Sequence, residues 1–249
     1  MQKFTKILLL LSLTIGSCAA SGNLLIDGNF DNLGAGSKAT TYTLNTFETV
    51  GTRLSGTAQG WYLVGMSSAT SGQDLDCIVI STNIQNCNNI TFGTTPTLSP
   101  DGGNFLSVDG DSTYSLPVAQ NVSITAGLQY QITFYQAAAQ QSGLGKSALP
   151  GGGTTEQWSV SLNGGTAQTS TLMNNAYEGF TGWTQQTMTF IANSTNASAA
   201  LQFVALGTPA GFPPIALLDG VTLSQVPEPS TWGLAGLGLF AIVFVRKLQ

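Results

Sequence analysis

The chain has 249 residues, of which 42% are hydrophobic, only 8% are charged and none is histidine. Between residues 22 and 226, three basic residues oppose eleven acidic ones, which gives a net charge of −8. This balance argues against nucleic acid as a partner, because binding it depends on Lys and Arg. The lack of histidine excludes Ser-His-Asp and Cys-His catalysis.

Residues 1–21 have the order of a secretory signal peptide. Two lysines precede an apolar run, ILLLLSLTI, and the small residues GSCAAS follow it. Such a helix is too short to anchor a protein permanently and is removed on export. Two cleavage modes fit the residues. We favour signal peptidase cutting near Ala20 or Ser21, and the alternative is lipoprotein processing that leaves an acylated Cys18 as the first residue.

Residues 22–225 are predicted to form one all-β domain, an antiparallel β-sandwich of the jelly-roll type. Short β-favouring runs alternate with clusters of Gly, Asn, Ser, Thr and Asp, and no long helical pattern competes with them. In chain order, strands are expected at 23–28, 41–50, 61–66, 77–82, 104–110, 128–136, 157–164, 187–192, 199–206 and 215–224. The Gly-rich stretch 140–156 is expected to be a surface loop within the domain.

The segment 128–136, LQYQITFYQ, shows the clearest strand pattern. Tyr130, Ile132 and Phe134 fall on one face, whereas Tyr135 and its polar neighbours fall on the other. This alternation is typical of a half-buried antiparallel strand.

Cys77 and Cys87 are the two cysteines that remain once Cys18 is removed or acylated. Exported proteins mature in an oxidising compartment, so we expect one disulfide between them, closing CIVISTNIQNC. Zinc would need more ligands than these two thiols supply.

Residues 226–249, VPEPSTWGLAGLGLFAIVFVRKLQ, carry a second apolar segment. A run of 14 uncharged residues, Trp232 to Val245, is shorter than the ~20 that span a bilayer comfortably, which suits a transient transmembrane helix. Two basic residues follow it and would lie on the cytoplasmic side. The PEP tripeptide before it resists helix formation and presents an extended chain. The predicted sorting residues are Pro227, Glu228, Pro229, Arg246 and Lys247.

Several landmarks together resemble those of the exported PEP-CTERM proteins of Gram-negative bacteria, whose main domain is similar to the galactose-binding-like jelly rolls of carbohydrate-binding modules. These landmarks are NLLIDGNFD, GW at 60–61, SPDGGNFLSVDGD, QNVSITAGLQYQITFYQA, GWTQQTMTFIA and ALLDGVTLSQVPEPSTW. The resemblance implies an exosortase, a membrane protease that cleaves near the PEP motif. The protein is then anchored transiently in the inner membrane and delivered to the cell surface or extracellular matrix.

Acidic and amide side chains near both ends of the domain are candidate ligands of a structural Ca²⁺, which the related carbohydrate-binding jelly rolls carry. The candidates are Asp27, Asn29, Asp31 and Asp219. Turn formation explains the same residues equally well. It is the preferred interpretation for the acids of DGGN and DGD, which are Asp101, Asp109 and Asp111.

Aromatic residues are the other candidate site, because a flat ring can stack on a sugar while polar neighbours bind its hydroxyls. Tyr62 and Tyr135 face away from their apolar neighbours and are the predicted ligand-binding residues. Trp158 alternates with apolar residues and is assigned to the core.

The resemblance favours a non-catalytic role, with polysaccharide as the ligand. No motif pairs Glu156 with Glu178 as the two acids of a glycosidase. The alternative is a structural or adhesive matrix protein without a defined ligand.

Overall fold

The computed structural model describes residues 22–32, 42–43, 60–64, 77–79, 81, 84, 86–87, 90–111, 116–143, 152–210 and 212–227. The signal peptide and the sorting residues Glu228, Pro229, Arg246 and Lys247 lie outside this part of the chain. Ser21–Val226 form one compact unit, which holds every described residue except Pro227. Among the described residues, we find no helix that meets the length and apolarity needed to cross a bilayer.

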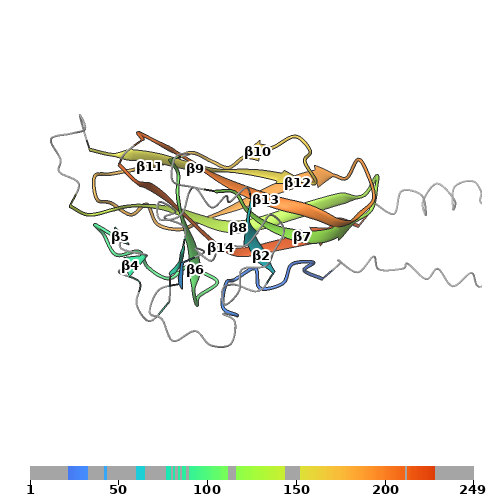
Figure 1. Ribbon diagram of the computed structural model, residues 1–249, viewed down its shortest axis with the longest axis horizontal. Helices are drawn as coiled ribbons and strands as arrows, with labels where there is room; N and C mark the ends of the chain where they lie inside the picture. Colours follow the sequence, from blue (N-terminus) through green and yellow to red (C-terminus); the bar gives the residue numbers. More distant parts are fainter. Residues whose placement is uncertain are drawn as a thin grey trace, which may run out of the picture. The chain divides into compact units, whose positions relative to one another are not determined.

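The described chain is all-β and forms two six-stranded antiparallel sheets (Figure 1). The β8 sheet has the order β1-β3-β6-β14-β8-β12, with β1 Tyr42–Thr43, β3 Cys77–Val79, β6 Phe105–Asp109, β14 Pro214–Gln225, β8 Gln129–Gln140 and β12 Thr184–Ile191. The β9 sheet has the order β10-β9-β13-β7-β2, with β10 Gln168–Thr169, β9 Thr154–Leu162, β13 Asn196–Thr208, β7 Val118–Ile124 and β2 Trp61–Leu63. Strand β11, Met173–Asn175, also pairs with β9, and β4 Asn86–Cys87 pairs with β5 Ile90–Thr91.

Consecutive long strands alternate between the two sheets. Strands β6, β8, β12 and β14 belong to the β8 sheet, whereas β7, β9 and β13 belong to the β9 sheet. Each sheet therefore buries one face against the other, as in jelly rolls. The predicted antiparallel β-sandwich is confirmed.

The main core lies between the sheets, and aromatic rings gather around Phe203 of β13. The ring of Phe203 lies 6.1 Å from Trp61, 5.4 Å from Phe134 and 6.0 Å from Trp158, measured between centroids. Strand β9 alternates buried and half-buried residues throughout, as the two-residue period requires. Trp158 is fully buried, so its assignment to the core is confirmed.

A second apolar cluster covers one end of the outer face of the β8 sheet. It contains buried Phe105, Ala137, Ala139 and Leu217, against which the half-buried Trp183 packs. Both faces of β8 are therefore covered beyond Tyr135, and the strand loses its alternation there. For this reason the pattern predicts an end at residue 136, although β8 continues to Gln140.

The N-terminal segment is not the strand expected at 23–28. It consists of bends and turns held beside β14: the Leu24 amide donates to the Leu223 carbonyl over 2.8 Å, and the Val221 amide donates to the Gly28 carbonyl over 2.8 Å. The Gln120 side chain also bonds both backbone groups of Ile26. A buried side-chain amide thus takes the place of a strand partner.

One expectation differs from the structure, one strand was missed, and the disulfide stays untested. The loop expected at 140–156 is shorter, because β9 already begins at Thr154. Strand β7 was not predicted, since VAQNVSI mixes polar residues into its apolar face. The side chains of Cys77 and Cys87 lie outside those described. No disulfide is found among the described residues, and this pairing stays a prediction.

Candidate functional site

The two tyrosines predicted to bind ligand lie on opposite faces of the sandwich. Tyr62 is on β2, half-buried on the outer face of the β9 sheet, where its hydroxyl donates to Asn121 Oδ1 over 2.7 Å. Tyr135 is half-buried on β8, on the outer face of the β8 sheet. One ligand-binding face can therefore use only one of them.

Tyr135 belongs to a face that carries mostly uncharged polar residues. In register, Gln185 of β12 lies on one side of Tyr135 and Asp219 of β14 on the other. The next rows along the strands are Thr187, Thr133 and Thr222, and then Thr189, Gln131 and Ser224. The Thr133 and Thr222 hydroxyls are hydrogen-bonded at 2.6 Å. This face offers hydroxyl and amide groups around one ring.

A loop lies against this face beside Tyr135. The Trp183 indole donates to the Thr97 carbonyl over 2.9 Å, and the Ser99 hydroxyl donates to Asp219 Oδ2. Gly220 has φ +57°, and an added Cβ would lie 3.0 Å from Tyr135 Cδ2 and 3.1 Å from Asp101 Cβ. The absence of a side chain at Gly220 thus lets Asp101 lie close to the Tyr135 ring.

Asp219 is a buried carboxyl group in this region. Its side chain is fully buried, and its Oδ1 has no hydrogen-bond partner. Burial raises the pKa of the carboxyl to about 7, and the negative charges of Asp101 and Asp31 add to this effect. Nothing in the sequence context of Asp219 indicates burial, because LLDG has the composition of an ordinary turn.

Of the four predicted calcium ligands, the structure brings Asp31 near Asp219. Asp31 accepts hydrogen bonds from the Asn104 amide and from Asn29 Nδ2, and a Cβ at Gly103 would collide with its carboxylate. Asp27 Oδ1 instead accepts a bond from the Asn32 amide within its own turn.

Asp31 and Asp219 offer the oxygen donors that Ca²⁺ prefers. The Asn29 side-chain amide lies beside Asp31, to which its Nδ2 donates over 3.0 Å. Across the described part of the chain, no group of three or more His, Cys, Asp or Glu is arranged to hold a metal. Calcium at this set of residues stays a prediction.

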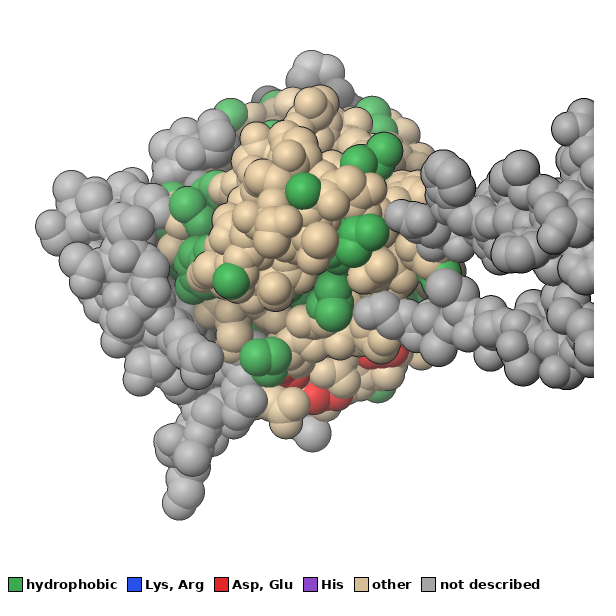
Figure 2. Space-filling model, turned by 90° about the vertical axis from the view of Figure 1, so that its right-hand side faces the viewer, with side chains coloured by type: hydrophobic (Ala, Val, Ile, Leu, Met, Phe, Trp, Pro, Cys, Tyr) green, Lys and Arg blue, Asp and Glu red, His purple; other side chains and the backbone are tan. Residues whose placement is uncertain are grey.

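The described surface is largely uncharged. The described residues include eight carboxylates and no Lys, Arg or His. Figure 2 shows one face, on which hydrophobic groups are scattered and carboxylates lie only near one border. A partner of this face would be bound by hydroxyl and amide groups rather than by cationic side chains.

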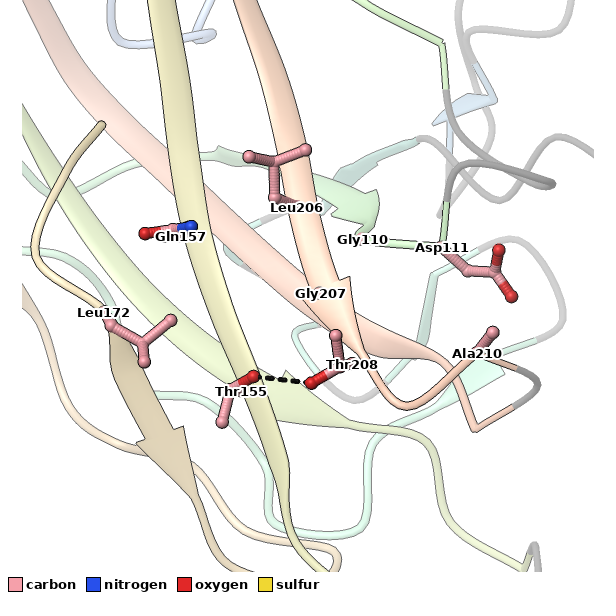
Figure 3. Close-up of a pocket in the computed structure, with 9 residues that line it drawn as sticks. All are labelled: Gly110, Asp111, Thr155, Gln157, Leu172, Leu206, Gly207, Thr208 and Ala210. Atoms are coloured by element: carbon pink, nitrogen blue, oxygen red, sulfur yellow. Dashed lines mark hydrogen bonds between the residues drawn. The ribbon is translucent and has the colours of Figure 1, made fainter. Parts of the chain in front are cut away.

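A pocket of ≈330 Å³ lies over the β9 sheet (Figure 3). Leu172 and Leu206, both partly exposed, form apolar walls, and the hydroxyls of Thr155 and Thr208 are hydrogen-bonded at 2.8 Å. Figure 3 shows Asp111 on the far side of β13 from Leu172. None of the nine lining residues is aromatic, so this pocket lacks the ring on which a sugar stacks.

Two further acids are buried, contrary to what their sequence context indicates. Asp109 ends β6 with no exposed surface, so it is not the surface turn expected from DGD, and burial raises its pKa to about 7. Glu156 of β9 points into the sandwich, where neither carboxylate oxygen has a hydrogen-bond partner, and burial raises its pKa to about 8. Because Glu156 is buried between the sheets, its carboxyl cannot contact the glycosidic bond of a polysaccharide bound at the surface.

Three solved structures indicate the range of structural likeness. The Stig cyclase Fisc from Fischerella sp. TAU, in complex with (3Z)-3-(1-methyl-2-pyrrolidinylidene)-3H-indole, has a TM-score of 0.51 at 14% identity, covering 85% of this chain and 100% of its own. The apo form of a cyclase from Fischerella sp. gives 0.51 at 14% identity, covering 86% and 100%. The module TmCBM61, in complex with beta-1,4-galactotriose, gives 0.35 at 15% identity, covering 68% and 90%, which is too distant to carry an argument.

The likeness to the cyclases shows a shared fold alone, because the identities are low. No curated protein matches the chain in sequence. The described residues give no positive indication of catalysis. In sequence, residues 225–247 match the family model described as the PEP-CTERM protein-sorting motif. The chain thus carries a PEP-CTERM sorting motif, which indicates a protein exported by way of an exosortase and associated with the cell surface.

Proposed function

We propose that the exported domain binds polysaccharide without catalysis, through the outer face of the β8 sheet around Tyr135. The observation that carries this proposal is the half-buried Tyr135 ring beside the exposed Gln185, followed along the strands by rows of Thr, Gln and Ser. A half-exposed ring can stack on the apolar face of a sugar, and amide and hydroxyl groups can bind its hydroxyls.

The charge of the domain favours a neutral polysaccharide. The described residues carry carboxylates and no cationic side chains, and Asp101 lies beside the Tyr135 ring. A chain of uronic acids would be repelled at short range, since like charges are unfavourable across an interface.

Delivery completes the proposal. Signal peptidase releases the N-terminus, and the residues after 225 hold the chain in the inner membrane until exosortase cleaves it. The domain then acts at the cell surface or in the extracellular matrix of a Gram-negative bacterium.

A structural Ca²⁺ at Asp31 and Asp219, with the other predicted ligands Asp27 and Asn29, would neutralise carboxylates next to the Tyr135 face.

Affinity electrophoresis of the full-length chain in gels containing neutral glucan, galactan or xylan tests the binding. The wild type should be retarded by at least one of these polymers, and Tyr135→Ala should migrate as in a gel without polymer. The matched control is Tyr62→Ala, which removes the same ring from the opposite face and should leave retardation unchanged.

Two results would contradict the proposal. The first is a wild type that is retarded neither by these gels nor by a gel of exopolysaccharide from the producing bacterium. That result favours a structural or adhesive matrix protein without a defined ligand. Retardation lost with Tyr62→Ala but kept with Tyr135→Ala would move the site to the β9 sheet. Thermal melting of both variants separates lost binding from lost folding.

A further inference from the structure

The last strand of the domain ends near an exposed isoleucine. The Val226 amide donates to the Gln129 carbonyl over 2.8 Å, and Gln129 pairs in register with Ile191 of β12. Neighbouring strands lie about 4.8 Å apart, so Ile191 is about 10 Å from the point where the chain leaves β14. The Ile191 side chain is 73% exposed, more than any other large hydrophobic side chain in the described part of the protein.

The described N-terminal segment begins at the same end of β14. The Leu24 amide donates to the Leu223 carbonyl over 2.8 Å, and the Leu223 amide donates to Asn23 Oδ1 over 3.0 Å. Leu24 is also an exposed hydrophobic residue. Because Leu223 lies three residues before Val226, the chain enters and leaves the domain at one end, with an apolar side chain beside each point.

The turns at this end are uncharged. Residues 125–128 connect β7 to β8, residues 192–195 connect β12 to β13, and the Gly127 amide donates to the Ala192 carbonyl over 2.7 Å. Neither of these described turns contains an acidic or basic residue, although the chain as a whole is acidic. A bilayer surface could therefore meet both turns without desolvating a charge.

Covalent geometry keeps this end close to the membrane once the sorting segment is inserted. The apolar run begins at Trp232, six residues after Val226. Six residues span at most about 20 Å when fully extended. The lipid headgroups occupy a layer about 6 Å thick, which takes up part of this length. The end that carries Ile191 is thus held within reach of the headgroups at a high local concentration.

We propose that this end of the sandwich docks on the bilayer surface before exosortase acts, with Ile191 and Leu24 inserted among the lipid headgroups. Docking requires the anchoring by the sorting segment proposed above and does not depend on polysaccharide binding. Two apolar side chains alone would bind a bilayer weakly, but the covalent link removes most of the entropic cost of association.

This orientation keeps the proposed sugar-binding face clear of the membrane. Tyr135 lies six residues along β8 from Gln129, in the direction away from the docked end. At about 3.3 Å per residue, the ring is about 20 Å from that end. The anchored form should therefore leave the Tyr135 face open to polymer before the sorting segment is cut.

Tryptophan quenching by brominated lipid tests the docking, with the full-length chain reconstituted into phosphatidylcholine vesicles. Ile191→Trp adds an indole at the docked end, and the matched control Leu172→Trp adds one at the opposite end. Leu172 is 47% exposed and lines a pocket with Gly207, where an added Cβ would collide with Pro214 at the start of β14. The emission that each variant adds to that of the wild type is compared in vesicles with and without bromine in the upper acyl chains.

Bromine should remove most of the emission that Ile191→Trp adds and should leave that of Leu172→Trp nearly unchanged. The wild type itself should be partly quenched, because Trp232 begins the inserted run. If Ile191→Trp does not fold, Gln129→Trp takes its place, since Gln129 is an exposed residue of the same row.

Four results would overturn the docking. Quenching of the wild type without added quenching in Ile191→Trp does so and leaves the anchoring intact. Equal quenching in both variants does so too, because the domain would then lie on its side. A wild type that bromine does not quench overturns docking and anchoring together. If Ile191→Asn slows removal of the sorting segment in cells while Ile191→Trp is unquenched in vesicles, the surface contacts exosortase instead of lipid. Retardation in polysaccharide gels is measured separately, so failure of docking is distinguishable from failure of sugar binding.

Discussion

The buried carboxyl of Glu156 should make the stability of the domain fall as the pH rises. Burial raises its pKa from an ordinary value of 4.5 to about 8, although the nearby Thr154 hydroxyl acts in the opposite direction. The folded state therefore holds the proton more tightly than the unfolded state. The stability that the neutral form contributes is fully present below pH 4.5 and is lost as the pH rises through about 8.

The magnitude follows from this difference in pKa. At about 1.4 kcal/mol per pH unit, the change from 4.5 to about 8 corresponds to about 5 kcal/mol. About 4 kcal/mol of this falls between pH 5 and pH 8.5. Such a loss is a large fraction of the 5–15 kcal/mol that stabilises an ordinary domain.

The assay is urea unfolding of the full-length wild type and Glu156→Gln between pH 5 and pH 8.5, followed by tryptophan fluorescence. Gln has nearly the same shape but does not titrate. The variant should be no more stable than the wild type at pH 5, because its buried amide also lacks partners and costs about 1–3 kcal/mol. The free energy of unfolding of Glu156→Gln, relative to that of the wild type, should then rise by about 4 kcal/mol between pH 5 and pH 8.5.

The other buried acids, Asp109 and Asp219, titrate in both proteins and cancel in the difference between them. Glu178→Gln is the matched control, since it makes the same chemical change at a half-buried residue whose carboxylate accepts a bond from the Gly143 amide. The reasoning is refuted if wild type and Glu156→Gln show parallel pH dependence.

Two further substitution experiments and one chemical measurement test other parts of the molecule. Gly103→Ala should destabilise the domain more than Gly102→Ala by about 1–3 kcal/mol in urea unfolding; both glycines have positive φ, but only at 103 would a Cβ collide with a carboxylate. Replacing Pro227–Pro229 with alanines should trap a full-length membrane-bound form, seen by cell fractionation and mass spectrometry; normal processing would contradict the role given to the motif. Thiol titration of the denatured mature protein should find neither Cys77 nor Cys87 free, whereas two reactive thiols would exclude their disulfide.

Local pattern alone was enough to predict the sandwich and its sorting signal. The two-residue period places Trp158 in the core and Tyr135 outside it, and it locates the long strands β8, β9, β12, β13 and β14 within a few residues. These features depend on neighbours along the chain, because a strand covered on one face alternates apolar and polar residues. The PEP tripeptide, apolar run and basic end are likewise read from consecutive residues.

Tertiary structure alone decided which polar residues are buried and which surfaces meet. Tyr62 and Tyr135 are placed on opposite faces by the partition of strands between sheets, which no local period reveals. Asp109 and Asp219 have the sequence context of turns, yet both are fully buried. Burial of a carboxylate is set by segments distant in sequence, such as the loop whose Ser99 bonds Asp219, because desolvation depends on everything that packs around the group.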